Sequence, residues 1–516
     1  MRRLTLLLGL CLLPALVSQV SASAKDEKYI IVSLVPEEDP YFEAARELLR
    51  LRGGRIIKTS PGALPSLLND FRQARPQFVA VVLRPEMLDE NLVHQFLKLA
   101  TKVDDDPFVD FAYGFITGDS AEAAVSLAGA GKRAEQKPKQ PDMAMVAVAG
   151  GELAESVTTT QDLPLRNGYL KQTTHLIAAG ESASASASQE IDPKQDDTFI
   201  REVMPQLSGH SILLFAGHGY PSHVVGGPTY RHLAGQRFDG AVVMNIACYT
   251  GVTCRWFDND WQSMKIRRKE VPAQESFCLN MLKTGVAGYV AYVSPRPAGP
   301  AMFGDALTLA TAGESVGELV RNNANSVVLA HLQQGYDGLH FVELADGAPI
   351  ARKRKVQDML IAMSTGGVLF GDPAYVPFKA RSKAHPVQLT VDRKTDSILA
   401  RIDVAGPMYH FFCSDQVVMW DETRPSIRLE AVVPLGGRYV EDVRLASSTL
   451  GDVPHRLTAA TEEHNGQRFL HVKASFAQPE IKQLMQFAQD GLAGSFEIKT
   501  SSQPRDAAVV RRAETP

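Results

Sequence analysis

The chain carries the run ILLFAGHG at residues 212–219 and the run AVVMNIACYTG at residues 241–251. Each run starts with apolar residues typical of a buried strand and ends in a reactive side chain, His218 in the first and Cys248 in the second. Because the carboxyl ends of neighbouring parallel strands open on one crevice, we expect the two side chains to lie together. The two runs therefore predict an α/β fold with a site at one edge of its sheet.

A thiol and an imidazole at that edge would form a nucleophile and a general acid or base. Glycines at 217, 219 and 251 would let the backbone approach a substrate and present N–H groups to an oxyanion. A single Cys after an apolar run is often a core residue, and a single His is often structural. The joint placement at equivalent strand ends favours the functional interpretation.

The first part of the chain alternates short apolar runs with helical stretches. Because strand, helix and strand repeat, we expect a parallel sheet with helices on its faces and an N-terminal α/β subdomain over 25–131. The expected strands are 29–35, 55–57, 78–83 and 110–116, and the expected helices are 42–52, 63–74, 91–103 and 119–129.

A polar stretch from Gly131 to Gln140 predicts a linker to a second α/β subdomain over 142–380. Further strands are expected at 143–149 and 285–293, with a helix at 273–284 between the second run and the last strand. Alternating apolar and polar residues then predict an immunoglobulin-like β-sandwich over 381–500. The polar stretch 501–516 predicts a disordered tail.

Residues 1–24 have the composition of a signal peptide. Arg2 and Arg3 precede an apolar stretch of 14 residues, and Ala22-Ser23-Ala24 offers a cleavage site. Fourteen residues are short for a membrane span, which needs about 20. We therefore expect an exported protein, secreted, periplasmic or on the cell surface, with no membrane span after cleavage.

The 516 residues carry a net charge of −4 and include five cysteines. This balance lacks the basic field of a nucleic-acid-binding protein, so no nucleic-acid partner is expected. If Cys248 is the nucleophile and Cys11 is removed with the signal peptide, then Cys254, Cys278 and Cys413 can form at most one disulfide, and the pairing stays open. The sequence does not indicate an oligomeric state.

The two runs resemble the catalytic signature of the caspase-fold cysteine peptidases, and of the gingipain family in particular. The resemblance is good over 211–293 and looser over 28–380, where Leu369-Phe370-Gly371-Asp372-Pro373 is similar to the family's closing motif. The resemblance implies two α/β subdomains with parallel sheets followed by an immunoglobulin-like sandwich. It also implies that Cys248 attacks a scissile carbonyl, that His218 protonates the leaving amine, and that the N–H groups of Gly219 and Cys248 hold the oxyanion.

Arginine-specific gingipains bind a basic side chain with an acid that lies before the dyad histidine. The corresponding region offers Glu152, Glu155 and Asp162, and Trp256 is a further candidate for substrate binding. The substrates would be proteins or peptides. The chemistry requires no cofactor, although the resemblance is compatible with a structural calcium ion.

Three alternatives remain beside hydrolysis by this dyad. The same site would act as a transpeptidase if an amine intercepted the acyl-enzyme, or the chain could be a caspase-fold scaffold whose activity has lapsed. Gly313-Glu314-Ser315-Val316-Gly317 fits the elbow of a serine hydrolase, but no strand precedes it, and Ser315 with Glu318 predicts a helix capping box. His218, His223, His232 and Asp239 match no zinc spacing, so no metal site is expected.

Overall fold

The computed structural model describes residues 28–503 apart from several internal stretches: 105–107, 150–154, 166–167, 179–196, 261, 296–305, 307–308, 311–312, 334–342, 351–366, 379–386, 405–426, 452–454, 465–466 and 477–491. The predictions for the signal segment 1–24, for Glu152 and Cys413 and for nearly all of the tail lie outside these residues.

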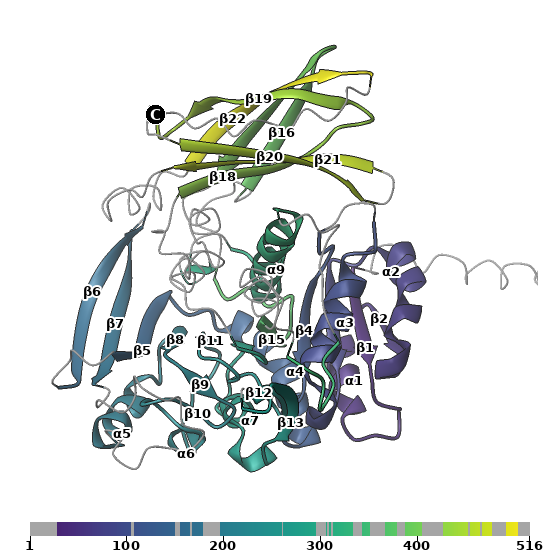
Figure 1. The fold of residues 1–516 in the computed structure, drawn as a ribbon. Coiled ribbons are helices and arrows are strands. Elements are labelled where there is room, and N and C mark those ends of the chain that lie inside the picture. Colours follow the sequence, from purple (N-terminus) through teal and green to yellow (C-terminus); the bar gives the residue numbers. More distant parts are fainter. Residues whose placement is uncertain are drawn as a thin grey trace, which may run out of the picture.

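One mixed sheet of 11 strands organises the α/β part of the chain, in the order β2-β1-β3-β4-β15-β14-β11-β8-β5-β7-β6 (Figure 1). Its strands are β1 (Tyr29–Ser33), β2 (Arg55–Lys58), β3 (Phe78–Val82), β4 (Ala112–Ile116), β5 (Asp142–Ala149), β6 (Val157–Leu165), β7 (Gly168–Ala178), β8 (Ile212–Ala216), β11 (Val242–Asn245), β14 (Gly288–Tyr292) and β15 (Gly367–Gly371). Most neighbours are parallel, and only the pairs β14–β15 and β6–β7 are antiparallel. The predicted alternation of strands and helices is confirmed.

The two predicted α/β parts share one sheet instead of carrying a parallel sheet each. β15 pairs with β14 on one side and reaches β4 through the pair Phe370–Phe115 on the other, so both halves share one sheet. This pairing could not be predicted from the sequence, because β15 is formed by residues far along the chain and runs antiparallel to β14.

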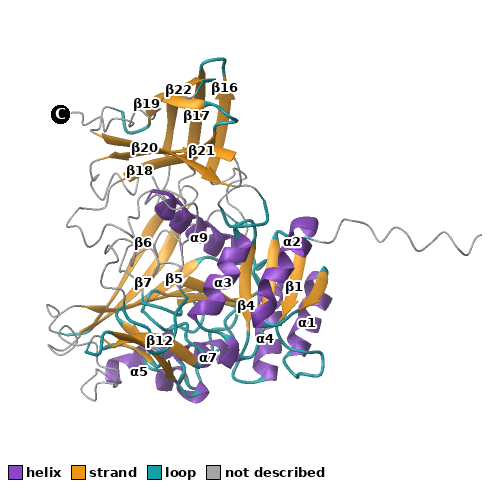
Figure 2. Cartoon of the chain, turned by 45° about the vertical axis from the view of Figure 1, so that its right-hand side comes forward, coloured by secondary structure: helices purple, strands orange, loops and turns teal. Residues whose placement is uncertain are grey.

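Helices cover both faces of the first half of the sheet, as Figure 2 shows. Ile31 packs among residues of α1 (Phe42–Arg52) and α4 (Ala121–Gln136), whereas its neighbours Ile30 and Val32 pack with α2 (Leu68–Ala74) and α3 (Glu90–Ala100) on the other face. This period of two follows from the pleat of a strand that is buried on both sides. The remaining helices are α5 (Asp197–Gln206), α6 (Tyr230–Leu233), α7 (Phe277–Lys283) and α9 (Val316–Gln333), with short 3₁₀ turns at Pro61–Leu67, Pro85–Met87 and Ala273–Glu275.

The predicted linker from Gly131 to Gln140 is helical over its first half, because α4 continues to Gln136. Gly131 is buried, and a Cβ built there would lie 2.9 Å from the Cβ of Tyr375. The polar composition belongs to the exposed side of the last helical turns, while glycine lets the segment around Tyr375 pack closely on the other side.

Asp372, at the end of the closing motif, is buried between the two halves. Its carboxylate accepts hydrogen bonds from the Tyr29 hydroxyl at 2.8 Å and from Arg52 Nε at 2.5 Å. Arg52 also pairs with Glu135 of α4 at 2.6 Å. Burial, with the Asp372 charge beside it, raises the pKa of Tyr29 well above its usual value. The hydrogen bonds of Asp372 therefore link β1 and α1 to the segment that follows β15.

The elbow pattern around Ser315 is the start of α9 rather than a nucleophile turn. Ser315 Oγ accepts from the Glu318 N–H at 3.1 Å, and the Glu318 carboxylate accepts from the Ser315 N–H at 2.9 Å. The predicted capping box is confirmed, and its hydroxyl is fully buried.

Beyond residue 386 the chain forms two antiparallel sheets that share one core, as the predicted β-sandwich requires. One sheet has the order β16-β17-β22-β19 and the other β18-β21-β20. In an immunoglobulin constant domain the last strand belongs to the three-stranded sheet, whereas here the last described strand, β22, lies in the four-stranded one, so immunoglobulin connectivity is not established. The strands are β16 (Val387–Arg393), β17 (Ser397–Val404), β18 (Ile427–Pro434), β19 (Tyr439–Ser448), β20 (His455–His464), β21 (Gln467–Phe476) and β22 (Leu492–Ser501).

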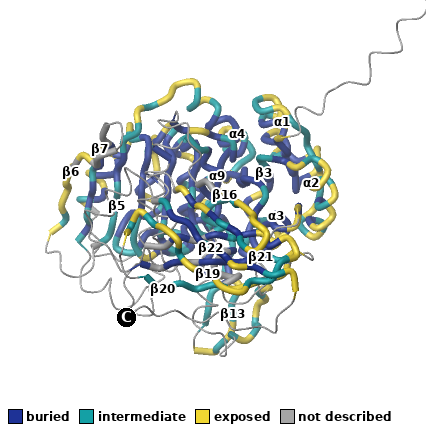
Figure 3. The backbone as a smooth tube through the Cα atoms, turned by 90° about the horizontal axis from the view of Figure 1, so that it is seen from above, coloured by how far each residue is buried: buried dark blue, intermediate teal, exposed yellow. Residues whose placement is uncertain are grey.

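Buried residues follow the central sheet and the helices against it, while exposed residues lie at the periphery (Figure 3). Of the helices that the structure describes, none is long and apolar enough to cross a membrane.

Candidate active site

His218 stands just beyond the carboxyl end of β8. Phe215 at the end of this strand is fully buried, and two residues later the chain turns at Gly217, whose φ of 154° is uncommon for residues with a side chain. A Cβ at Gly217 would also lie 3.0 Å from Val224 Cγ1. After this turn, His218 is exposed to solvent.

Cys248 occupies the equivalent position beyond the neighbouring strand β11. Ile212 pairs with Val242 and Phe215 with Asn245, an offset of 30 positions. His218 and Cys248 are separated by the same 30 positions, so each lies three residues past the last paired residue of its strand. Cys248 is partly exposed. Both residues therefore follow the carboxyl ends of neighbouring parallel strands, at one edge of the sheet.

The backbone of Gly219 lies directly against that of Cys248. A Cβ built on Gly219 would lie 2.5 Å from the Cys248 carbonyl oxygen and 2.7 Å from Ala247 Cβ. Only glycine fits this approach. The segment after His218 and the turn that bears Cys248 thus contact each other, which places the two predicted oxyanion residues side by side.

Three side chains fix the turn that presents Cys248. Asn245 Oδ1 accepts from the Ala247 N–H at 2.9 Å, and Thr250 Oγ1 donates to the Ala247 carbonyl at 2.8 Å. The buried Tyr289 hydroxyl donates to the Thr250 carbonyl at 2.9 Å and accepts from Asn245 Nδ2 at 3.3 Å. Hydrogen bonds therefore hold the backbone on both sides of the cysteine.

Tyr249, directly after Cys248, has a φ of 60°, in the left-handed region that non-glycine residues seldom occupy. Its N–H donates to the carbonyl of the buried Ser294 at 3.3 Å, and its ring lies 6.4 Å from that of Trp256. Tyr249, Trp256, Val252 and Val271 form a small apolar cluster against which Cys248 packs. This packing holds the uncommon conformation.

Other histidines near the site are engaged elsewhere. His223 is buried and its ring stacks on Tyr220 at 5.6 Å; burial lowers the pKa of His223 to about 4, which keeps it neutral. His232 is buried in a capping box with Thr229. His218 is the exposed one of these three, as a proton-transfer group requires.

Cys254 and Cys278 are free thiols. Burial raises the pKa of Cys254 to about 11 and that of Cys278 well above its usual value. A thiol in such surroundings is mostly protonated and poorly nucleophilic at neutral pH.

Of the predicted acidic residues, Glu152 lies outside the described residues, and the structure does not bring Glu155 or Asp162 next to His218 and Cys248. Val157, Leu176, Ala147 and Ala216 form one row across β6, β7, β5 and β8. The exposed Glu155 stands two residues beyond that row, level with His218 but three strand spacings away, roughly 14 Å.

Asp162 lies at the opposite end of the strands. It pairs with Lys171 of β7, which in turn pairs with Asp142 at the amino end of β5. Trp256, the fourth candidate, is buried beside Tyr249, where it packs the turn that carries Cys248. Among the described residues, no three or more His, Cys, Asp or Glu side chains gather as metal ligands.

Sequence reasoning did not identify Asn245, Thr250 and Tyr289 as site residues. Asn245 and Thr250 could have been noticed, because polar residues flank the cysteine at the end of an otherwise apolar strand. Tyr289 gave no local signal, because its contact with Asn245 spans 44 positions and depends on the pairing of β14 with β11.

No protein-family model and no curated protein matches the chain. Among solved structures, the chain is similar to the crystal structure of the Arg-specific cysteine proteinase gingipain R, with 11% identity, 75% of this chain and 87% of that chain covered, and a TM-score of 0.39. It is also similar to the complex of Porphyromonas gingivalis RgpB pro- and mature domains, with 12% identity, coverages of 73% and 87%, and a TM-score of 0.38.

Proposed function

We propose that the chain is a cysteine-type peptidase that hydrolyses peptide bonds in proteins or peptides with Cys248 and His218. The observation that carries the proposal is that these two residues follow the carboxyl ends of the neighbouring parallel strands β11 and β8. The contact of Gly219 with the Cys248 backbone supports it, because the same approach brings two potential oxyanion donors together.

The proposed reaction begins with attack of the Cys248 thiolate on the scissile carbonyl carbon. The negative charge that develops on the carbonyl oxygen would be held by the backbone N–H groups of Gly219 and Cys248. His218 then donates a proton to the leaving amine as the C–N bond breaks, which leaves a thioester on Cys248. Finally His218 takes a proton from water and the resulting hydroxide attacks the thioester. The C–S bond breaks, the carboxylic acid is released, and the Cys248 thiolate and protonated His218 are restored.

The hydrogen-bonded turn around Cys248 supports this chemistry. A nucleophile must be held close to a reactive geometry, and a displacement of about 1 Å can cost on the order of 100-fold in rate. The hydrogen bonds from Asn245, Thr250 and Tyr289 provide that restraint, and Cys248 is partly exposed.

Export is part of the proposal. It is supported by the basic, apolar and small-residue segments within residues 1–24. The proposed reaction needs no cofactor, since a thiol and an imidazole carry every step.

Selective alkylation of Cys248 tests the proposal. Under reducing conditions, iodoacetamide should label Cys248 much faster than Cys254 and Cys278, whose thiols are kept protonated. Mass mapping of the labelled peptides gives the rates. His218→Ala should slow both labelling and turnover, turnover by about 100-fold or more, whereas Cys254→Ala should keep activity.

A peptide library read by mass spectrometry, with and without an added amine acceptor, completes the test. Hydrolysed products support the peptidase, and amine-linked products would indicate transpeptidation by the same dyad. If Cys248 labels no faster than Cys254 and no peptide is cut or joined, the proposal is wrong and a scaffold role is favoured.

A further inference from the structure

A second polar site lies at the far end of the strands that carry the dyad. It is a cavity of about 540 Å³ bounded on one side by Ser211, Gly240 and Gly285, which precede β8, β11 and β14. The end of α4 and the segment from Tyr375 to Phe378 form the other side. Such a volume suits a small organic molecule. Seven residues of extended chain separate Ser211 from His218, so the cavity is roughly 23 Å from the dyad.

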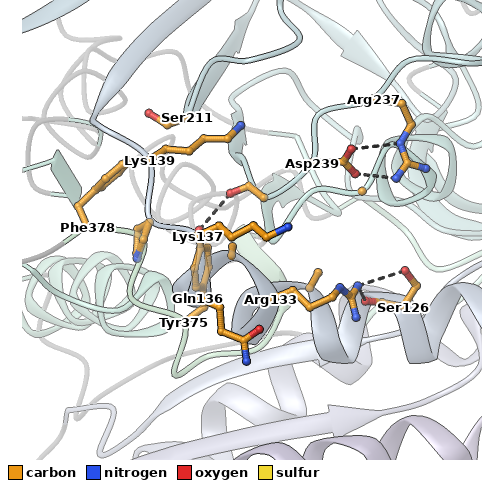
Figure 4. Close-up of a pocket in the computed structure, with 15 residues that line it drawn as sticks. Ser126, Arg133, Gln136, Lys137, Lys139, Ser211, Arg237, Asp239, Tyr375 and Phe378 are labelled. Atoms are coloured by element: carbon orange, nitrogen blue, oxygen red, sulfur yellow. Dashed lines mark hydrogen bonds and ion pairs between the residues drawn. The ribbon is translucent and has the colours of Figure 1, made fainter.

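The charged side chains around this cavity are mostly basic. Four cations line it, Arg133, Lys137, Lys139 and Arg237, against the single acid Asp239 (Figure 4). Lys137 and Lys139 come from the stretch between α4 and β5, whereas Arg237 and Asp239 come from the loop before β11. Chain segments far apart in sequence therefore concentrate positive charge in one hollow.

Two of the cations already have partners. Arg237 pairs with Asp239 at 2.7 Å, and this pair lies over Gly285, where a Cβ would come within 2.2 Å of the Asp239 carboxylate. Arg133 donates to the Ser126 carbonyl at 2.7 Å. Of the residues that the structure describes, none forms an ion pair or hydrogen bond with the ammonium groups of Lys137 and Lys139.

The positive charge left after these pairings sets the class of ligand. The ammonium groups of Lys137 and Lys139, which have no partner among the described residues, match the charge of a phosphate monoester, about −1.5 to −2 near neutral pH. Pro377 and the largely buried Phe378 give the cavity an apolar border, which suits an organic group attached to the phosphate. A cavity of this volume is also larger than a bare phosphate needs.

We propose that this cavity binds a small organic phosphate, with the phosphate on Lys137 and Lys139 and the organic part against Phe378. Because the site joins α4 of the first half to the amino ends of β8 and β11 in the second, a bound ligand would link the two halves of the sheet. Binding needs neither Cys248 nor His218, so it is independent of the peptidase proposal.

Calorimetric titration of the full chain with phenyl phosphate at low salt tests this site. Phenyl phosphate should bind, inorganic phosphate should compete with it more weakly, and phenol should not bind. The double variant Lys137→Gln, Lys139→Gln should raise the Kd by about 10-fold or more, because each charge-assisted hydrogen bond is lost. Affinity should also fall below about pH 6, where the monoester takes up a proton.

Two matched variants separate a site from diffuse charge. Lys98→Gln with Lys102→Gln removes the same charge from exposed positions on and after α3 and should leave the Kd unchanged. Lys137→Arg with Lys139→Arg keeps the charge and should retain binding. Equal weakening by the two glutamine pairs, binding of phenol as tight as that of phenyl phosphate, or no saturable binding up to roughly 10 mM ligand would overturn the proposal.

Discussion

At the scale of single residues, the dyad is bracketed by uncommon backbone conformations. Gly217 has a φ of 154° just before His218, and Tyr249 has a φ of 60° just after Cys248. A non-glycine residue in a sparsely populated region costs on the order of 1–3 kcal/mol and persists only where its surroundings hold it. Here the Tyr249–Trp256 contact and the bond to Ser294 do so. Part of the folding free energy therefore maintains the backbone conformation on both sides of the two residues.

Gly219→Ala tests how closely the two segments must approach. The added methyl would lie 2.5 Å from the Cys248 carbonyl oxygen, so the turn must shift. We expect kcat/KM to fall by roughly 100-fold with a cooperative thermal transition retained. Gly62→Ala is the matched control, because a Cβ there meets nothing within 4 Å. Unchanged activity in Gly219→Ala would show that the approach is not needed.

His223 should make stability depend on pH. Its folded-state pKa of about 4 lies below the ordinary value of 6.5, so the fold favours the neutral ring. The stabilisation is fully present above pH 6.5 and is lost as the pH falls toward 4, by about 3 kcal/mol in all. Urea unfolding of wild type and His223→Gln at pH 7 and pH 4 measures it. Equal losses in both proteins would contradict the assignment.

At the scale of elements, β14 supports the turn after β11. The Tyr289 hydroxyl of β14 hydrogen-bonds to the Thr250 carbonyl and to Asn245, so the strand that follows Cys248 in the chain also holds the turn that bears it. The sequence predicts the strand itself, because apolar residues between glycine and proline signals suffice. It does not predict this role, because the hydroxyl contact exists only after β14 and β11 align in register.

Tyr289→Phe should weaken catalysis more than substrate binding. Removing the hydroxyl leaves the Thr250 carbonyl and Asn245 amide without this buried partner, at a cost of about 1–3 kcal/mol in stability. We expect kcat and the alkylation rate of Cys248 to fall by roughly 10-fold or more while KM changes little.

Tyr113→Phe is the control for that variant. The Tyr113 hydroxyl is buried and has no hydrogen-bond partner among the described residues, so its removal should leave stability and activity unchanged. If both variants behave alike, Tyr289 is only a packing residue.

At the scale of the whole molecule, the two halves are one body because they share a sheet and a buried ionic junction. Elements such as α1 and β8 could be predicted, because the amphipathic period of a helix and the apolar run of a buried strand appear in consecutive residues. The junction was not, because Tyr29, Arg52 and Asp372 meet only in three dimensions. The sequence also made Asp162 a candidate for substrate binding, because its position depends on strand pairing. The register of β6 with β7 places it at the far end of the sheet.

Arg52→Leu should destabilise the whole α/β part. It leaves the buried Asp372 carboxylate without its cation, which typically costs about 3–5 kcal/mol. Arg50→Leu on the same helix is the control, since Arg50 is largely exposed and pairs only with Glu47; it should change stability little. Thermal and urea unfolding compare the two. Similar small losses in both would show that the junction contributes little.

The position of β15 in the sheet also implies that this strand pairs late in folding. This strand lies between β4 and β14, yet it comes from residues 367–371, after every other strand of the sheet has been made. Until it arrives, β4 and β14 each keep an unpaired edge, and contacts of long sequence separation form slowly. The polypeptide therefore cannot assemble its continuous sheet until nearly the whole α/β region is available. A nascent chain would stay incompletely folded until that last strand is inserted.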